Sequence, residues 1–149
     1  MNDLIIPHDA LVFVGDGRKA LFLRNRGDAM SPALAVERVA RDENPATREQ
    51  GSDKPGRAFS SVGQGRSGIE QTDWHDIEEH RFAKKAARQI EDLVRASPVK
   101  KLFVVAPART LADLREALHK DVRQAIVAEV EKDLTRHPVA EIARLLTGK

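Results

Sequence analysis

The stretch "ALVFVGDGRKALFLR", Ala10 to Arg24, decides the expected fold. Its first part, Ala10 to Gly15, is an unbroken apolar run rich in β-branched and aromatic residues, which predicts a buried strand. Asp16-Gly17 follows and is a strong signal for a tight turn between antiparallel strands. Lys19 to Arg24 predicts the returning strand. The ordered part of the chain therefore begins with a β-hairpin.

Strands and helices alternate after this hairpin. Ala33 to Val39 predicts a third strand, which completes an antiparallel meander. Asp73 to Ala96 predicts a long helix, because its apolar residues recur at helical spacing. Lys101 to Ala106, "KLFVVA", predicts another buried strand. Since a strand, a helix and a strand in that order favour a parallel crossover, the sequence predicts an α/β domain with a mixed sheet.

The last third of the chain contains one ambiguous segment. Thr110 to His119 predicts a helix capped by Thr110. From Val122 to Leu134 the apolar residues keep a helical period, so the pattern alone favours one long helix, although a strand at Ala125 to Val130 also fits. Pro138 to Leu146 predicts a final short helix with proline in its first turn.

Composition restricts the kind of protein. A chain of 149 residues predicts one domain over residues 1–149, and 41% hydrophobic residues suffice for a core. The lack of cysteine excludes disulfides and thiolate metal sites. The start "MNDLIIPHDA" lacks the basic and long apolar parts of a signal peptide, and no apolar run is long enough to span a membrane. These features predict a cytoplasmic protein.

Residues 41–72 differ from the rest. Five of the nine glycines lie between Gly51 and Gly68, and apolar residues are sparse, which predicts a long glycine-rich loop. The net charge of the chain is only +2, so binding of nucleic acid requires a local cluster of cations. Arg57 and Arg66 on this loop could meet phosphate, because arginine side chains and backbone amides both bind anions.

Two motif matches in and after this loop fail on context. The run Gly63 to Gly68 matches G-x-G-x-x-G, but no strong strand precedes it and no helix is expected directly after it, so a dinucleotide loop is rejected. Ile69-Glu70 stands where a phosphate-binding Walker loop needs Lys-Ser.

The histidines of the predicted long helix do not form a metal site. His75 and His80 are about 140° apart around a helix and cannot share a metal. We therefore expect no cofactor and no bound metal.

Asp16 is the main candidate for catalysis by a carboxylate. It follows the first strand, and Asp73 and Asp76 at the start of the long helix could approach it to hold a catalytic metal. The simpler interpretation, which we favour, is that Asp16-Gly17 only forms the hairpin turn. No serine lies in a G-x-S-x-G elbow, so a nucleophilic triad has no support.

Several segments together resemble the bacterial host attachment protein family, whose members are named as required for attachment to host cells. The resemblance runs from the first strand to Leu146. It rests on four short matches, which are Gly65-Arg66-Ser67, Arg81-Phe82-Ala83, Leu114-Arg115 and Lys132-Asp133-Leu134-Thr135 before Pro138. This family is similar to the central domain of archaeal and eukaryotic peptide release factors. The resemblance implies a ribonuclease-H-like fold with a mixed five-stranded sheet, and a strand at Ala125 to Val130.

The resemblance also points to Gln64. Release factors carry a Gly-Gly-Gln loop between the third strand and the long helix, and the residues at that place here are Gly63-Gln64-Gly65. Val62 stands where the first glycine is expected, which argues against hydrolysis of peptidyl-tRNA. We therefore predict a binding module rather than an enzyme. The expected RNA or phosphate contacts are Arg57, Gly63, Gln64, Gly65, Arg66 and Ser67.

Three functions remain open at this point. The first is contact with RNA or the ribosome, which would make a role in host attachment indirect. The second is hydrolysis, either by a metal-dependent nuclease that uses Asp16 and Asp73 or by a peptidyl-tRNA hydrolase-like reaction at Gln64. The third is a protein-interaction domain whose glycine-rich loop docks on a partner.

Overall fold

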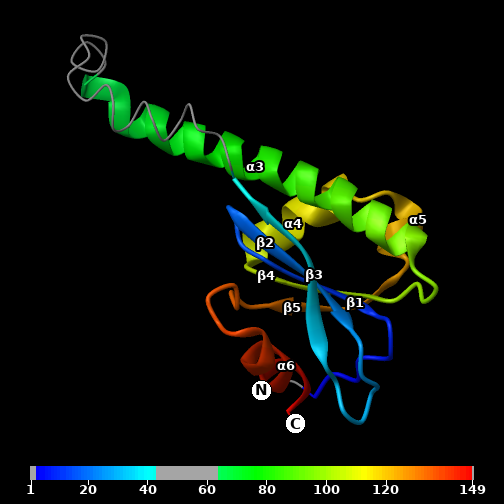
Figure 1. Cartoon of the computed structure of the whole chain (residues 1–149). Helices are drawn as coiled ribbons and strands as arrows, with labels where there is room; N and C mark the ends of the chain where they lie inside the picture. Colours follow the sequence, from blue (N-terminus) through cyan, green and yellow to red (C-terminus); the bar gives the residue numbers. More distant parts are fainter. Residues whose placement is uncertain (1–2, 43–63, 149) are drawn as a thin grey trace.

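The computed structural model describes residues 3–42 and 64–148, whose strands form one five-stranded sheet (Figure 1). The strands are β1 (Leu11–Gly15), β2 (Lys19–Asn25), β3 (Leu34–Arg41), β4 (Leu102–Ala106) and β5 (Ile126–Glu131). The helices in these ranges are α3 (Gln64–Ala96), α4 (Ala108–Ala117), α5 (Lys120–Arg123) and α6 (Val139–Thr147).

The sheet has the order β3-β2-β1-β4-β5. β1 pairs antiparallel with β2, and β2 pairs antiparallel with β3, as the Asp16-Gly17 turn predicts. β4 lies parallel to both β1 and β5. The prediction of an α/β domain with an antiparallel meander followed by parallel strands is confirmed.

Helices pack on both faces of the sheet (Figure 1). Because side chains alternate along a strand, β1 directs Phe13 to one face and Val12 and Val14 to the other. The first face packs against α3, α4 and α5, and the ring of Phe13 meets that of Phe22 edge to face at 5.3 Å. The second face packs against α6 and the segment around Ile6. The strands β1 and β4 are therefore buried on both sides.

The expectation of one long helix from Val122 to Leu134 is wrong. The chain forms the short helix α5 and then β5, which pairs with β4. The strand implied by the family resemblance, Ala125 to Val130, is confirmed with small shifts at its ends. The helical spacing of the apolar residues gave a wrong prediction because two separate elements supply them. Val122 is buried in the cluster with α3, and Val130 is buried in the cluster on the other face of the sheet. Their spacing fits a continuous helix only by coincidence.

Two helices begin earlier than their sequences predict. α4 begins at Ala108 after Pro107, so Thr110 is a buried residue inside the helix and not its cap. α3 begins at Gln64, so residues 64–72, expected in the glycine-rich loop, are helical. The glycines at 65 and 68 led to this error, since glycine disfavours helix interiors. Of that predicted loop, residues 43–63 lie outside the described residues.

Within residues 3–42 and 64–148, none of the helices has the length and apolar character needed to cross a membrane.

Candidate functional site

Four of the six residues predicted to contact RNA lie in the described part of the chain, at the start of α3. Arg57 and Gly63 lie outside the described residues. The run from Gln64 to Ser67, which contains Gly65 and Arg66, forms the first turn of α3. Figure 1 shows that the first turns of α3 extend beyond the edge of the sheet. The helix therefore carries this turn away from the hydrophobic core.

Asp16 is held in the turn between β1 and β2. Its Oδ1 accepts hydrogen bonds from the backbone N–H groups of Arg18 and Lys19, each at 2.7 Å. Its Oδ2 lies 3.0 Å from the hydroxyl of Thr135, which is also 2.9 Å from Asp133 Oδ1. Both oxygens of Asp16 thus have structural partners. They fix the turn and connect it to the segment that follows β5.

Carboxylates of α3 lie near this turn without forming a metal site in the described part of the chain. A side chain at Gly17 would come within 2.6 Å of Glu79 Cδ, so Glu79 packs directly over the turn. The carboxylate of Asp76 forms an ion pair with Arg109, whose Nη2 lies 2.6 Å from Asp76 Oδ1. Residues 3–42 and 64–148 contain no group of three His, Asp or Glu side chains arranged to hold an ion. Since the Asp73 side chain is outside the described part, the nuclease hypothesis receives no support here and stays a prediction.

The side of α3 that faces α4 is a network of opposite charges. His80 Nδ1 lies 3.1 Å from Asp113, and Glu91 accepts a hydrogen bond of 2.9 Å from the backbone N–H of His119. Arg109 donates a hydrogen bond to the carboxylate of Asp76, which raises the pKa of that guanidinium. These contacts position α4 on α3. They are structural and leave little free charge for a ligand.

Other cations of α3 project into solvent. Arg81, Lys84, Lys85 and Arg88 are all exposed. The guanidinium of Arg81 lies 5.8 Å from the centroid of the Trp74 ring, and Trp74 is itself exposed. The sequence analysis assigned these cations no binding role. The signal that could have identified them as a surface is their spacing, which groups cations around one solvent-exposed sector.

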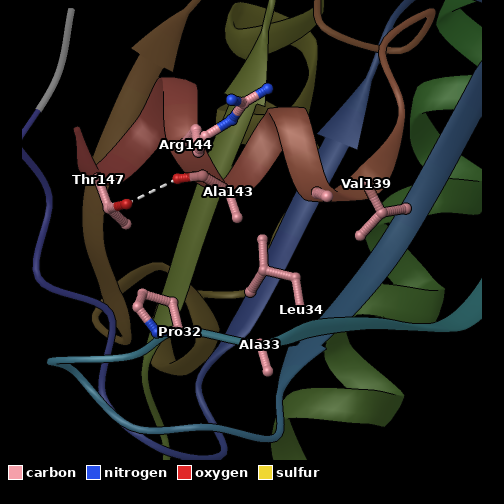
Figure 2. A pocket seen from close by; sticks show the side chains of 8 residues that line it. Pro32, Ala33, Leu34, Val139, Ala143, Arg144 and Thr147 are labelled. Carbon is pink, nitrogen blue, oxygen red and sulfur yellow. Dashed lines mark hydrogen bonds between the residues drawn. The ribbon is translucent and has the colours of Figure 1, made fainter. Parts of the chain in front are cut away.

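A pocket of about 270 Å³ lies between α6 and the start of β3, and Figure 2 shows its lining. Pro32, Leu34 and Val139 contribute apolar surface, and Arg144 points away from Leu34. The Thr147 hydroxyl donates to the carbonyl of Ala143 at 2.7 Å. Specific small-molecule sites need polar groups that converge on the ligand. This pocket lacks such a group among the described residues.

The sequence matches one family model across most of its length. Residues 9–146 match bacterial archaeo-eukaryotic release factor family 12. The chain belongs to this family. No significant match to a curated protein sequence was found. The release-factor part of the earlier resemblance is thereby supported, and the family places the sheet, α3 and α6 of this chain within a release-factor-like domain.

Membership of family 12 directs attention to the start of α3. Gln64, which stands between two glycines in the sequence, is the first residue of α3, whereas the resemblance implies that the release-factor glutamine lies in a loop between β3 and this helix. The roles of Gln64, Arg66 and Ser67 stay predictions, because only their helical backbone is described. Among the side chains that the structure describes, the exposed cations of α3 begin at Arg81, farther along the helix than this turn.

Proposed function

We propose that this protein binds RNA at the ribosome as a release-factor-like module. The observation that carries the proposal is the family match over residues 9–146. Release factors act on peptidyl-tRNA in the ribosome, so a member of a family named for them is expected to meet RNA. The proposal implies a cytoplasmic site of action.

The electrostatics of α3 support this function. Arg81, Lys84, Lys85 and Arg88 are exposed on a helix that extends past the sheet. Exposed cations bind phosphates and release counterions, so such binding weakens steeply as salt rises. Trp74 adds an exposed aromatic ring on the same helix, and aromatic rings stack on unpaired bases.

The turn around Gln64 has a specific role in this proposal. Gln64 and the backbone amides of Gly63 and Gly65 approach an RNA end, while Arg57 and Arg66 neutralise phosphate. Its support is the family relation and the position of Gln64 at the first residue of α3. A ribonuclease-H-like classification of the sheet, and an indirect effect on attachment to host cells, belong to the same proposal.

Sedimentation with ribosomes tests the proposal. Purified protein is centrifuged with ribosomes at low and high salt, together with Gln64→Ala and the double variant Arg57→Ala/Arg66→Ala. The matched control is Arg136→Ala/Arg144→Ala, which removes two exposed arginines from the C-terminal part of the chain. We expect salt-sensitive association of the wild type and the control, and a loss in the Arg57/Arg66 variant.

The outcomes separate the functions that the sequence leaves open. Absence of association at low salt overturns the proposal and favours a protein partner, for which the exposed Trp74 and Ile77 offer apolar surface. Association that persists at high salt also contradicts it. If association is salt-sensitive, release of peptide from peptidyl-tRNA by wild type but not by Gln64→Ala would establish the hydrolase instead of a pure binding module.

A further inference from the structure

A second cationic site lies between β3 and α3, away from the Gln64 turn. A groove of about 210 Å³ separates the end of β3 from the middle of α3. Three cationic side chains, those of Arg38, Arg41 and Lys85, are among its lining residues. The groove is lined by no carboxylate among the described residues. It is therefore an electropositive hollow in a chain whose overall charge is nearly balanced.

The three cations are available to a ligand. Arg38, Arg41 and Lys85 are exposed, and in the described part of the chain none of their side chains has an ion pair or hydrogen bond. Asp42 adjoins Arg41 in the chain but does not line the groove. Glu37 adjoins Arg38, and Arg24 binds its carboxylate at 2.7 Å and Arg26 at 3.4 Å. The carboxylate of Glu37 is thus already neutralised. The cations of the groove keep their capacity to bind phosphate.

Gln89 gives the groove a second kind of contact. It lines the groove, and its side-chain Oε1 is buried without a hydrogen-bond partner among the described residues. Buried polar atoms of folded proteins almost always have a partner. A rotation of the Gln89 side chain toward the groove would let a ligand hydroxyl supply the missing donor. The required ligand therefore combines anionic oxygens with a hydroxyl group.

The sugar–phosphate backbone of RNA has this combination. Its phosphates match the three cations, and its ribose 2′-hydroxyl can donate to Gln89. A volume of about 210 Å³ is several times the roughly 30 Å³ that one water occupies, so a sugar–phosphate unit can enter. Lys85 and Gln89 lie on the same side of α3 as Arg81 and Trp74, since these residues are four or seven positions apart. A strand in the groove can continue along α3 to the exposed ring of Trp74.

We propose that the groove between β3 and α3 binds single-stranded RNA through phosphate contacts from Arg38, Arg41 and Lys85 and a ribose contact from Gln89. This site rests on the proposed function and adds to it a surface and a preference for RNA over DNA. It differs from the turn around Gln64 in position and in chemistry. Cations bind either nucleic acid, whereas Gln89 distinguishes the sugar.

Two oligonucleotides that differ only in the 2′-hydroxyl test the proposal. Fluorescence anisotropy measures binding of oligouridylate and of oligodeoxyuridylate to the full chain over a range of salt concentrations. We expect the wild type to prefer oligouridylate. Gln89→Leu, which is similar in size, should reduce this preference by about threefold to tenfold, because one hydrogen bond to the sugar is lost. Binding of the DNA should change little.

Charge variants test the phosphate contacts separately. Arg38→Gln and Lys85→Gln should weaken binding of RNA and DNA alike, and each should reduce the salt slope by roughly 0.7. Arg136→Gln is the matched control, since Arg136 is exposed in the C-terminal part of the chain and does not line the groove. Circular dichroism checks that each variant is folded. If Gln89→Leu is not, Gln89→Glu replaces it and should weaken both nucleic acids through repulsion of phosphate.

The results distinguish this site from the proposed function. Equal effects of Arg136→Gln and Lys85→Gln, or an unchanged sugar preference in Gln89→Leu, would overturn the groove while ribosome association of the wild type persists. A wild type that binds neither oligouridylate nor ribosomes at low salt would overturn both proposals. Loss of RNA binding in Arg38→Gln and Lys85→Gln, with the control intact, is the result that supports the groove.

Discussion

The two long sides of α3 carry opposite electrostatic arrangements. On the side that faces α4, Asp76 contacts Arg109 at 2.6 Å and His80 contacts Asp113 at 3.1 Å. On the side that faces β3, Lys85 and Arg38 line a groove with no carboxylate in the described part of the chain. One helix therefore uses paired charges where it packs on another helix, and keeps unpaired cations where it borders the open edge of the sheet.

This difference separates structural charges from charges that are available for binding. Paired surface charges contribute little to stability but select the orientation of the packed helices. Arg38 helps to lower the pKa of Glu37, but the cations of the groove also repel one another, and a ligand with negative charge would relieve this repulsion. The predictions below test whether the two sides of α3 differ in this way.

The largest loss of stability should come from a substitution in the hydrophobic core that holds α3 on the sheet. Ile90 of α3 is fully buried, in the cluster that joins the helix to the sheet. Ile90→Ala should lower the free energy of unfolding by about 3 kcal/mol, through lost burial and the resulting cavity. Urea unfolding followed by circular dichroism measures this. A loss below about 1 kcal/mol would mean that α3 is not held by this cluster.

The ion pair between β2 and β3 should show the next largest effect. Arg24 donates hydrogen bonds to both carboxylate oxygens of Glu37, and these bonds lower the Glu37 pKa from its ordinary value. Arg24 is buried and also donates to Ser97 Oγ at 2.6 Å. Glu37→Gln should cost about 1–2 kcal/mol at neutral pH, because it leaves this guanidinium without its anionic partner.

The pH dependence of the Glu37 variant has a defined direction. A carboxyl whose pKa is lower in the folded state stabilises the protein above its unfolded pKa of about 4.3. That contribution is lost as the pH falls through the lowered folded pKa. The difference in unfolding midpoint between wild type and Glu37→Gln should therefore shrink below about pH 4. Glu116→Gln is the control, since the Glu116 side chain is 80% exposed, and should show no such dependence.

Lys85→Gln should have a small effect of opposite sign. It removes one of three like charges from the groove, so the urea midpoint should stay constant or rise slightly, more at low salt than at high salt. The comparison with Arg109→Gln is the informative one. Arg109 has a partner in Asp76, so its removal should leave the midpoint unchanged or slightly lower. A clear loss of stability in Lys85→Gln would show that Lys85 has a structural role.

Local sequence patterns predicted most of the elements. The apolar runs of β1, β2 and β4 were readable because both faces of these strands are buried or nearly so. The boundaries of α3 and α4 were not readable. Gly65 and Gly68 weaken a helix signal that the remainder of α3 overcomes, and propensity is a weak guide when packing supplies most of the stability.

The sequence by itself determined the hairpin at Asp16-Gly17 and the α/β class, whereas Gln64, which was expected in a loop, is the first residue of α3. Only the tertiary structure decided that Arg38 and Lys85 line one groove, with Gln89 beneath them. These residues are distant in sequence and meet because the crossover through α3 lays the helix along the edge of the sheet. Periodicity records which face of an element is apolar, but it carries no information about which distant face lies opposite.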